Sequence, residues 1–313
     1  MRSGNRQFKA VCGGVVFFIT DGKSPSYIIN KYKIGKFSDN ILHLDQFEAF
    51  FLMSKNKIAP ENPSLENPTR LLDRISNTEV FLQVYPAYEK FKQHGLFVKV
   101  EGRNIRFRRS PSEEYSEPFL VIREDDSIEW ADLVKRGDFN FLIIDDEFDL
   151  TAYTLRRIEP VGENRFRFEE DIKQKGTSEL LFDPDSFPDW VGADFGRWKY
   201  LNRYERSHIL GTSNKESITE QLVYDDLISR GFILRTGFKY GSNFRIYAGD
   251  MESHAEFLVH VFPDIEQWYR ISRAVRVAHA VRKKMIFCGK VDEEILYLKI
   301  ERVRDPISSQ DQS

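Results

Sequence analysis

Two stretches of this chain repeat one pattern of residue types. Residues 88–100 and 224–236 each open with a tyrosine, place a glycine seven residues later and continue into an apolar run with a basic residue. The pattern predicts a helix that ends at a left-handed glycine and passes into a strand. A pattern that occurs twice predicts two related halves. The tyrosine and glycine pairs are Tyr88 with Gly95 and Tyr224 with Gly231.

The segments that follow also recur in the same order. Residues 118–121 resemble 256–259, and an apolar strand, an acidic turn and a second strand come after both. We therefore expect two tandem degenerate repeats, 1–160 and 161–313, and at roughly 150 residues per domain the length of 313 residues suits that number. The mixed order of strands and helices predicts an α/β class, α+β mixed.

Composition excludes several classes of protein. Lys and Arg number 46 against 49 Asp and Glu, so a uniformly basic nucleic-acid coat is excluded, while a local basic surface is not. Two cysteines, Cys12 and Cys288, are too few for a disulfide framework or a Cys-rich zinc site, which favours a reducing, cytoplasmic setting. The apolar run 10–19 is too short for a membrane span, and we expect it to be a buried first strand rather than a secretory leader.

Charge is distributed unevenly between the halves. Residues 272–304 carry nine basic residues against four acidic ones. A basic surface suits phosphate groups, and an acidic turn suits a basic surface on a partner. The two halves therefore predict two different roles. The matching part of the first half has an acidic turn made of Asp145, Asp146, Glu147 and Asp149.

Residues 268–285 have apolar residues at the spacing of one helix face. The opposite face of this predicted helix would carry Arg276, His279 and Lys283. Such a face is either solvated or in contact with phosphates, and the sequence leaves both open.

Residues 231–248 predict a strand, a glycine-containing turn and a second strand with Tyr247 near its end. His254 follows in a polar loop. Taken singly, the tyrosine is most simply a half-buried strand residue and the histidine a surface residue. The six histidines show no metal-ligand spacing, and no phosphate-binding glycine motif occurs, so we expect no metal and no cofactor.

Together, Tyr247, His254 and Lys283 would suffice for RNA cleavage without a metal. RNA supplies its own nucleophile, the 2′-hydroxyl, so the reaction needs a base for that proton, an acid for the departing 5′-oxygen and a cation for the phosphorane. Histidine suits proton transfer near neutral pH, and a tyrosine can act as a base where nearby cations assist it. Spacing alone does not select these three residues.

Several blocks of this half resemble the archaeal tRNA-splicing endonucleases. The resemblance implies Tyr247 as general base on the 2′-hydroxyl, His254 as general acid and Lys283 as the cation that stabilises the transition state. It implies 2′,3′-cyclic phosphate and 5′-hydroxyl ends, formed without metal or cofactor. The matching blocks are, in order, Tyr224 with Gly231, Thr236–Gly241, Phe244–Tyr247, His254–Val259, Ser272–Arg276 and Val281–Lys284.

The same resemblance implies the substrate, a precursor tRNA folded as a bulge-helix-bulge at its exon–intron junctions. Two arginines of the family clamp a bulge base between their guanidinium planes, and they fall here on Arg276 and Arg302. Guanidinium stacking suits an unstacked bulge base.

Double-length members of this family are homodimers in which the first repeat is inactive and its acidic loop docks on the partner chain. Each repeat joins an N-terminal α/β subdomain to a C-terminal, restriction-endonuclease-like nuclease subdomain, so about 214–304 would be the catalytic one. Arg108 and Ser116 stand roughly where the tyrosine and histidine align, which implies an inactive first repeat with a docking loop at 145–149. The family's helical pattern is present at Leu44–Ala49, but we find no counterpart in 183–215, which predicts a trimmed second repeat.

Two other interpretations stay open. The first is a catalytically inactive RNA-binding or structural subunit of a splicing endonuclease assembly, although one half keeps all three candidate catalytic residues. The second is a DNA nuclease, although no carboxylate cluster for a metal surrounds the turn at 237–247.

Overall fold

The chain forms two compact units. Unit 2 takes in two stretches of the first half, 124–139 and 152–160, so this division differs from the expected repeat boundary at residue 160, and the repeats themselves stay a prediction. Unit 1 comprises Met1–Arg123 and Asn140–Thr151, and unit 2 comprises Glu124–Phe139 and Ala152–Ser313. The computed structural model describes residues 8–13, 16–19, 25–60, 68–75, 77–166, 168, 180–211, 218–251 and 254–303.

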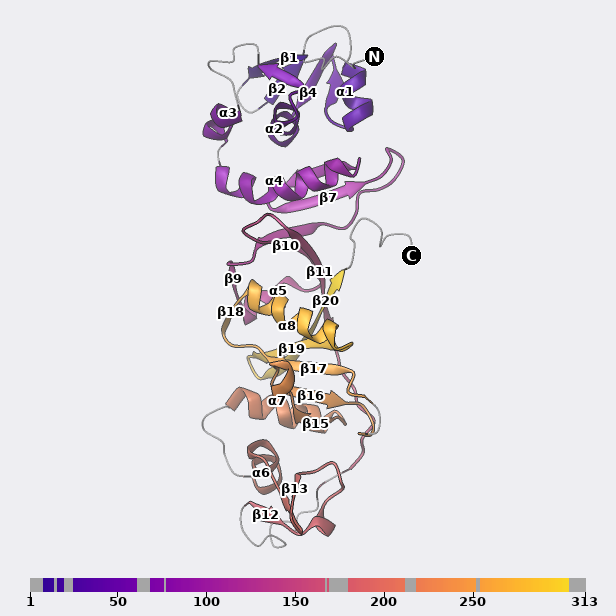
Figure 1. Ribbon diagram of the computed structural model, residues 1–313, viewed down its shortest axis with the longest axis vertical. Coiled ribbons are helices and arrows are strands. Elements are labelled where there is room, and N and C mark those ends of the chain that lie inside the picture. Colours follow the sequence, from indigo (N-terminus) through magenta and orange to yellow (C-terminus); the bar gives the residue numbers. More distant parts are fainter. Residues whose placement is uncertain are drawn as a thin grey trace. The chain divides into compact units, whose positions relative to one another are not determined.

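The N-terminal part of unit 1 contains a sheet whose described strands have the order β3-β4-β2-β1-β5 (Figure 1). The apolar run 10–19 contributes to two antiparallel strands, β1 and β2, rather than one. The helical pattern at Leu44–Ala49 falls at the start of α2, which packs against β2 and β4. The elements are β1 (Phe8–Gly13), β2 (Val16–Ile19), α1 (Pro25–Tyr32), β3 (Lys36–Ser38), β4 (Ile41–Leu44), α2 (Gln46–Ser54), β5 (Ile58–Pro60) and α3 (Pro68–Arg74).

The rest of unit 1 is a helix on a second sheet. Strand β6 pairs antiparallel with β7, β7 antiparallel with β8, and β8 parallel with β10. Helix α4 packs against β6, β7 and β8, and its buried Tyr88 and Phe91 face the core. The elements are α4 (Thr78–Gln93), β6 (Phe97–Glu101), β7 (Asn104–Arg108), β8 (Phe119–Arg123) and β10 (Phe139–Ile144).

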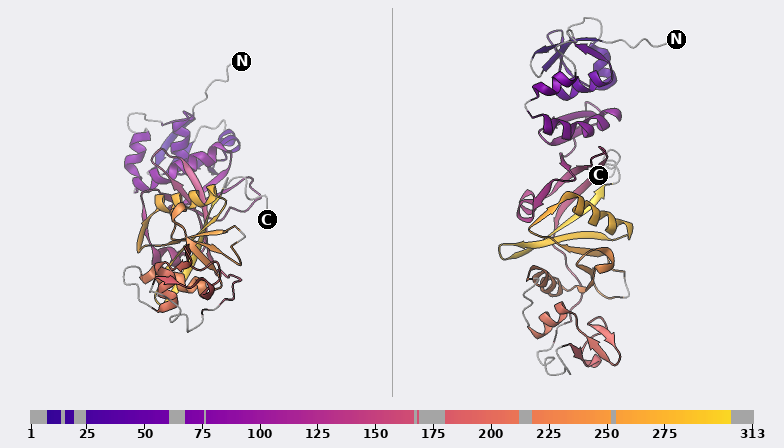
Figure 2. Two further views of the ribbon diagram at one scale, coloured as in Figure 1. Left: turned by 60° about the horizontal axis from the view of Figure 1, so that its bottom comes forward. Right: turned by 60° about the vertical axis from the view of Figure 1, so that its left-hand side comes forward.

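Unit 2 contains a sheet whose described strands have the order β15-β16-β17-β19-β20-β11. Helix α7 packs against β15, β17, β19 and β20, and α8 lies along β19 and β20 (Figures 1 and 2). Before α7 come β11 (Leu150–Ile158), β12 (Leu181–Phe182), η2 (Pro184–Ser186), β13 (Ala193–Phe195), β14 (Trp198–Tyr200) and α6 (Arg203–Leu210). The remaining elements are α7 (Ile218–Ser229), β15 (Ile233–Thr236), η3 (Phe238–Tyr240), β16 (Phe244–Tyr247), β17 (Phe257–Val261), β18 (Ile265–Gln267), α8 (Trp268–Ala280), β19 (Lys284–Val291) and β20 (Glu294–Val303).

Residues 78–158, the first segment, and 218–303, the second segment, share one order of elements. In the second segment β15 pairs antiparallel with β16, β16 antiparallel with β17, and β17 parallel with β19, as β6, β7, β8 and β10 do in the first. The predicted glycine turns are confirmed, because Gly95 has φ +72° and Gly231 has φ +90° directly after α4 and α7. The mixed α/β class is confirmed.

A β-hairpin followed by a helix precedes each segment. The sequence pattern indicated this unit only before the first segment. Strands β3 and β4 lead into α2, and β13 and β14 lead into α6 with the same pairing register. Asp45 with Glu48 and Asn202 with Glu205 form capping boxes at the two helix starts. The expectation that 183–215 holds no counterpart is therefore wrong.

Residues 124–139 of the first half are held in unit 2 by a strand pairing and by two equivalent hydrogen bonds. It folds as β9 (Ser127–Glu129) and α5 (Trp130–Arg136), and β9 pairs antiparallel with β18. The Trp130 amide donates to the Asp264 carbonyl at 3.0 Å, and the Trp268 amide donates to the Asp126 carbonyl at 3.0 Å. A Cβ at Gly289 would lie 2.8 Å from the Trp130 indole nitrogen, so the close packing of β19 on α5 requires glycine there.

Candidate active site

The hairpin of β15 and β16 places Tyr247. The predicted strand, turn and strand are confirmed, and Tyr247 ends β16 directly opposite Ile233, which begins β15. Alternation along the strand turns Tyr247 away from the face that carries Phe244 and Ile246, which pack under α7. Tyr247 is instead buried in a separate cluster with Ile233 and Ala255.

Lys283 also lies beside Ala255, but it is not part of the helix that the sequence pattern predicted for it. The helix expected to run to residue 285 ends at Ala280, so Lys283 does not lie on a helix face with Arg276 and His279. Arg282 has φ +56°, a conformation that no helix continues, and the chain turns directly into β19. The Lys283 ammonium then donates a hydrogen bond to the carbonyl of Ala255.

The three candidate catalytic residues therefore converge on Ala255. Tyr247 packs in its cluster, Lys283 donates to its carbonyl, and His254 precedes it in the chain with an exposed side chain. The parallel pairing of β17 with β19 causes this, because it sets Phe257 beside Lys284 and so aligns the starts of both strands. A phenol, an imidazole and an ammonium thus lie around one backbone position in unit 2.

The two adjacent lysines have different surroundings. Lys284 forms an ion pair with Glu256 at 2.7 Å, and this hydrogen bond raises the pKa of the Lys284 ammonium. Lys283 has only a neutral carbonyl as its partner among the described residues. Its positive charge is therefore not neutralised by a carboxylate there, which suits a group that must meet a phosphate.

Arg245 is a further cation at this site, and the sequence analysis did not single it out. It lies two residues before Tyr247 on the same strand, and its guanidinium carbon is 5.9 Å from the centre of the Tyr247 ring. Its Nε is buried and has no hydrogen-bond partner among the described residues. Residues i and i+2 of a strand share a face, so the predicted strand already places Arg245 on the same face as Tyr247.

The two arginines expected to contact a base both lie in unit 2. Arg276 is an exposed residue of α8, and Arg302 is an exposed residue near the end of β20. Arg302 is paired in register with Tyr153 on β11. Their exposure is compatible with a ligand, and their contact with a base stays a prediction.

The acidic turn between β10 and β11 is held by its own first residue. The Asp145 carboxylate accepts hydrogen bonds from the amides of Glu147 at 3.1 Å and Asp149 at 2.8 Å. Asp146 pairs with Arg123 at 3.2 Å, and the side chains of Glu147 and Asp149 are exposed. Phe148 stands among them with φ +65° and 61% of its surface exposed. The turn thus presents carboxylates and one aromatic ring to solvent.

The described residues contain no group of three or more His, Cys, Asp or Glu side chains arranged to hold a metal ion. None of the helices in the described ranges is long and apolar enough to cross a membrane.

Comparison with known families identifies the class to which this arrangement belongs. A sequence model described as the catalytic C-terminal domain of tRNA intron endonucleases matches residues 218–297. This stretch runs from the start of α7 into β20 and contains Tyr247, His254 and Lys283. The second segment therefore has the sequence of such a catalytic domain.

Relatives along the whole chain agree with this class. The tRNA-splicing endonuclease of Thermoplasma volcanium is 38% identical over 94% of this chain and 98% of its own length. That of Picrophilus torridus is 35% identical over 93% of this chain and 96% of its own, and that of Methanosarcina barkeri is 28% identical over 87% and 94%. The chain belongs to the tRNA-splicing endonuclease family, as its sequence blocks indicated.

Proposed function

We propose that this protein excises introns from precursor tRNA by cutting RNA at bulge-helix-bulge exon–intron junctions. The observation that carries the proposal is the convergence of Tyr247, His254 and Lys283 on Ala255, inside the stretch that matches the family's catalytic domain. Relatives named tRNA-splicing endonuclease over nearly the full length support the choice of substrate.

In this mechanism Tyr247 removes the proton of the 2′-hydroxyl, and the resulting oxygen attacks the adjacent phosphorus. His254 protonates the departing 5′-oxygen, and its exposed position gives it access to a bound strand. Lys283 stabilises the charge of the phosphorane, and Arg245 places a second cation beside the phenol. The products are a 2′,3′-cyclic phosphate and a 5′-hydroxyl, and the reaction uses neither metal nor cofactor.

The first repeat is inactive in this proposal and serves assembly. Two such chains form a homodimer, in which the acidic turn of Asp145, Asp146, Glu147 and Asp149 docks on a basic groove of the second copy. The exposed carboxylates of that turn support docking, since complementary charge favours both encounter and register. Two active sites per dimer would serve the two junctions of one intron. The protein acts in the cytoplasm.

The test is cleavage of a labelled bulge-helix-bulge RNA by the purified chain alone, in EDTA, with analysis of the ends. We expect cyclic-phosphate and 5′-hydroxyl ends, at a rate that the chelator does not change. A fully paired RNA of the same length is the control and should stay intact. Tight binding without cleavage would instead favour an inactive RNA-binding subunit, and activity that EDTA abolishes would favour metal-dependent nuclease chemistry.

A further inference from the structure

A cavity of about 510 Å³ lies in unit 2 at the turn end of the β15–β16 hairpin, opposite the end that carries Tyr247. Its walls come from the β13–β14 hairpin, α6, α7 and the turn η3. Thr236 pairs with Phe244 at this end, three positions along from the pair of Ile233 and Tyr247. At a strand's rise per residue, the pair of Thr236 and Phe244 lies about 10 Å from the pair that holds Tyr247, and the cavity extends back along β15 to Leu234.

The cavity is lined by aromatic rings. Tyr204 stacks on Tyr224 with centres 5.6 Å apart and meets the edge of Phe244 at 4.9 Å, forming the inner wall. Phe238 stands at the rim with 86% of its surface exposed, and Tyr200 also lines the cavity and is exposed. Rings left open to water beside a concave aromatic wall are a platform on which another flat ring can stack.

The turn that presents Phe238 is fixed by glycines at both ends. Gly241 has φ +64°, and a side chain at Gly237 would overlap Ser242, so neither position tolerates a larger residue easily. The amide of Gly241 donates to the carbonyl of Phe238 and closes the turn. Phe238 is therefore held outward by its own backbone, although its side chain is almost free of packing.

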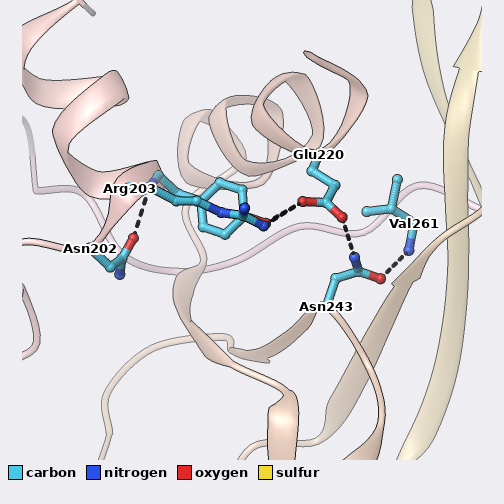
Figure 3. Close-up of polar contacts among 6 residues, drawn as sticks. Asn202, Arg203, Glu220, Asn243 and Val261 are labelled. Carbon is cyan, nitrogen blue, oxygen red and sulfur yellow. Dashed lines mark hydrogen bonds and ion pairs between the residues drawn. The ribbon is translucent and has the colours of Figure 1, made fainter. Parts of the chain in front are cut away.

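The polar part of the wall is preorganised by one carboxylate (Figure 3). Glu220 accepts hydrogen bonds from Arg203 at 3.0 Å, from the Tyr204 hydroxyl, and from the Asn243 amide at 2.9 Å. Asn243 in turn accepts from the amide of Val261 at 2.9 Å. Burial and the Glu220 contact raise the pKa of Tyr204 to about 12, so its hydroxyl stays a neutral donor near pH 7.

The charges of the lining balance. Arg203 and Arg235 line the cavity together with Glu205 and Glu220, and Glu220 is paired with Arg203. A balanced pocket does not select a phosphate, but it accepts a flat, neutral, hydrogen-bonding ring. The next residue after Phe238 is Lys239, an exposed cation that suits a backbone phosphate attached to such a ring.

We propose that this cavity binds one unpaired nucleobase of the RNA substrate, stacked on Phe238. The RNA strand is thereby held at the turn end of the β15–β16 hairpin, opposite the end that carries Tyr247. The inference rests on the proposed function, because it takes the substrate to be RNA with unpaired bulge nucleotides. It assigns a base-binding role to the turn at 236–241, separate from Tyr247, His254 and Lys283.

The test measures binding and cleavage separately. The binding probe is a bulge-helix-bulge RNA with 2′-deoxy nucleotides at both junctions, which removes the nucleophile and allows equilibrium titration. Phe238→Ala should weaken binding by roughly 5- to 150-fold, the range for loss of one base–aromatic stack, whereas Phe238→Trp should preserve it. Single-turnover cleavage of the normal RNA at subsaturating enzyme should fall by the same factor as binding. Phe195→Ala is the matched control, because Phe195 is 62% exposed in the same unit and does not line the cavity.

An abasic scan through the bulge identifies the bound base. One abasic position should weaken binding to the wild type and have no further effect on Phe238→Ala, since both changes remove the same stack. Equal binding by Phe238→Ala and the wild type would overturn the proposal, and so would an equal loss on a fully paired RNA. A change in sedimentation with RNA binding intact would also overturn it, in favour of a protein contact at Phe238. Because the probe cannot be cleaved, these results do not depend on activity, and a wild type that binds but never cuts normal RNA contradicts only the proposed function.

Discussion

The first and second segments offer the same three backbone positions but fill them with different chemistry. Tyr247 ends β16 opposite the first residue of β15, and Arg108 ends β7 opposite the first residue of β6. His254 lies three residues before β17, as Ser116 does before β8. Lys283 directly precedes β19, and Asp138 directly precedes β10. The tyrosine, histidine and lysine of one segment are thus replaced by arginine, serine and aspartate in the other.

In the first segment these positions hold the fold together. Arg108 donates to the carbonyls of Pro111 and Glu113. The buried Ser116 hydroxyl accepts from the Phe107 amide and donates to the Glu117 carbonyl, and the Asp138 carboxylate accepts from the Arg157 amide. Each of the three thus has a polar group hydrogen-bonded within the chain, although the Arg108 Nε is buried without a partner among the described residues. In the second segment His254 is exposed and Lys283 has only a carbonyl partner among the described residues, so both stay available to a substrate.

The largest expected effect comes from His254→Ala and Lys283→Ala. Each should lower single-turnover cleavage by about 10²- to 10⁴-fold while RNA binding changes little, because each removes a group that acts in the transition state. The matched variant Lys284→Ala should cleave at nearly the wild-type rate. Loss of binding with unchanged chemistry at saturation would reverse the roles assigned to the two residues.

The acidic turn should affect assembly. Because the Asp145 carboxylate holds the turn itself, the informative variant keeps it and combines Asp146→Asn, Glu147→Gln and Asp149→Asn. We expect the dimer dissociation constant, measured by sedimentation, to rise by roughly tenfold or more, with the difference shrinking at high salt. The control is the corresponding turn of the second segment, with Asp292→Asn and Glu293→Gln. Equal weakening by both variants would show a general charge effect rather than docking.

The two exposed arginines should have a smaller effect on RNA affinity. Arg276→Ala and Arg302→Ala should each weaken binding of the uncleavable bulge RNA by roughly two- to fivefold, the worth of one guanidinium–ring stack at an exposed site. Arg273→Ala, an exposed arginine on the same helix as Arg276, is the control. If it costs as much as Arg276→Ala, the helix contributes only diffuse positive charge.

The smallest effect concerns the residue before Lys283. Arg282 has φ +56°, and the residue at the matching place in the first segment is Gly137 with φ +69°. We expect Arg282→Gly to raise the free energy of unfolding by up to about 1 kcal/mol, since relief of the side-chain clash outweighs the entropy cost of glycine. Gly137→Ala should lower it by about 1–2 kcal/mol. Chemical denaturation measures both, and a destabilised Arg282→Gly would show that the arginine side chain makes a compensating contact.

Local sequence signals predicted local structure well. The glycines after α4 and α7, the hairpin that carries Tyr247 and helix α2 follow from short patterns of turn residues and apolar spacing, because φ and face alternation depend on near neighbours. The capping box of Asn202 and Glu205 is a signal of the same kind. The amide of Gly192 donates a hydrogen bond to Glu205 thirteen residues later, just as the amide of Gly35 donates to Glu48. The aromatic residues around it mask this pattern in the sequence.

The errors come from contacts between distant residues. Apolar spacing alone carries the helix of α8 to residue 285, whereas pairing of β19 with β17 draws Lys283 and Lys284 out of it. Nothing in the sequence near residues 124–139 indicates that they pack in unit 2. Trp130 packs closely against Gly289, and a glycine so far along the chain is not a local signal.

The sequence by itself determined the mixed α/β class, the family and the three candidate catalytic residues, because these depend on residue types in order along the chain. Only the tertiary structure decided that Tyr247 and Lys283 meet at Ala255 beside His254, that the matching positions of the first segment are occupied by structural hydrogen bonds, and that Phe238 stands open beside an aromatic cavity. The physical reason is that strand register and burial are set by pairing between segments far apart in the chain, which no local pattern specifies.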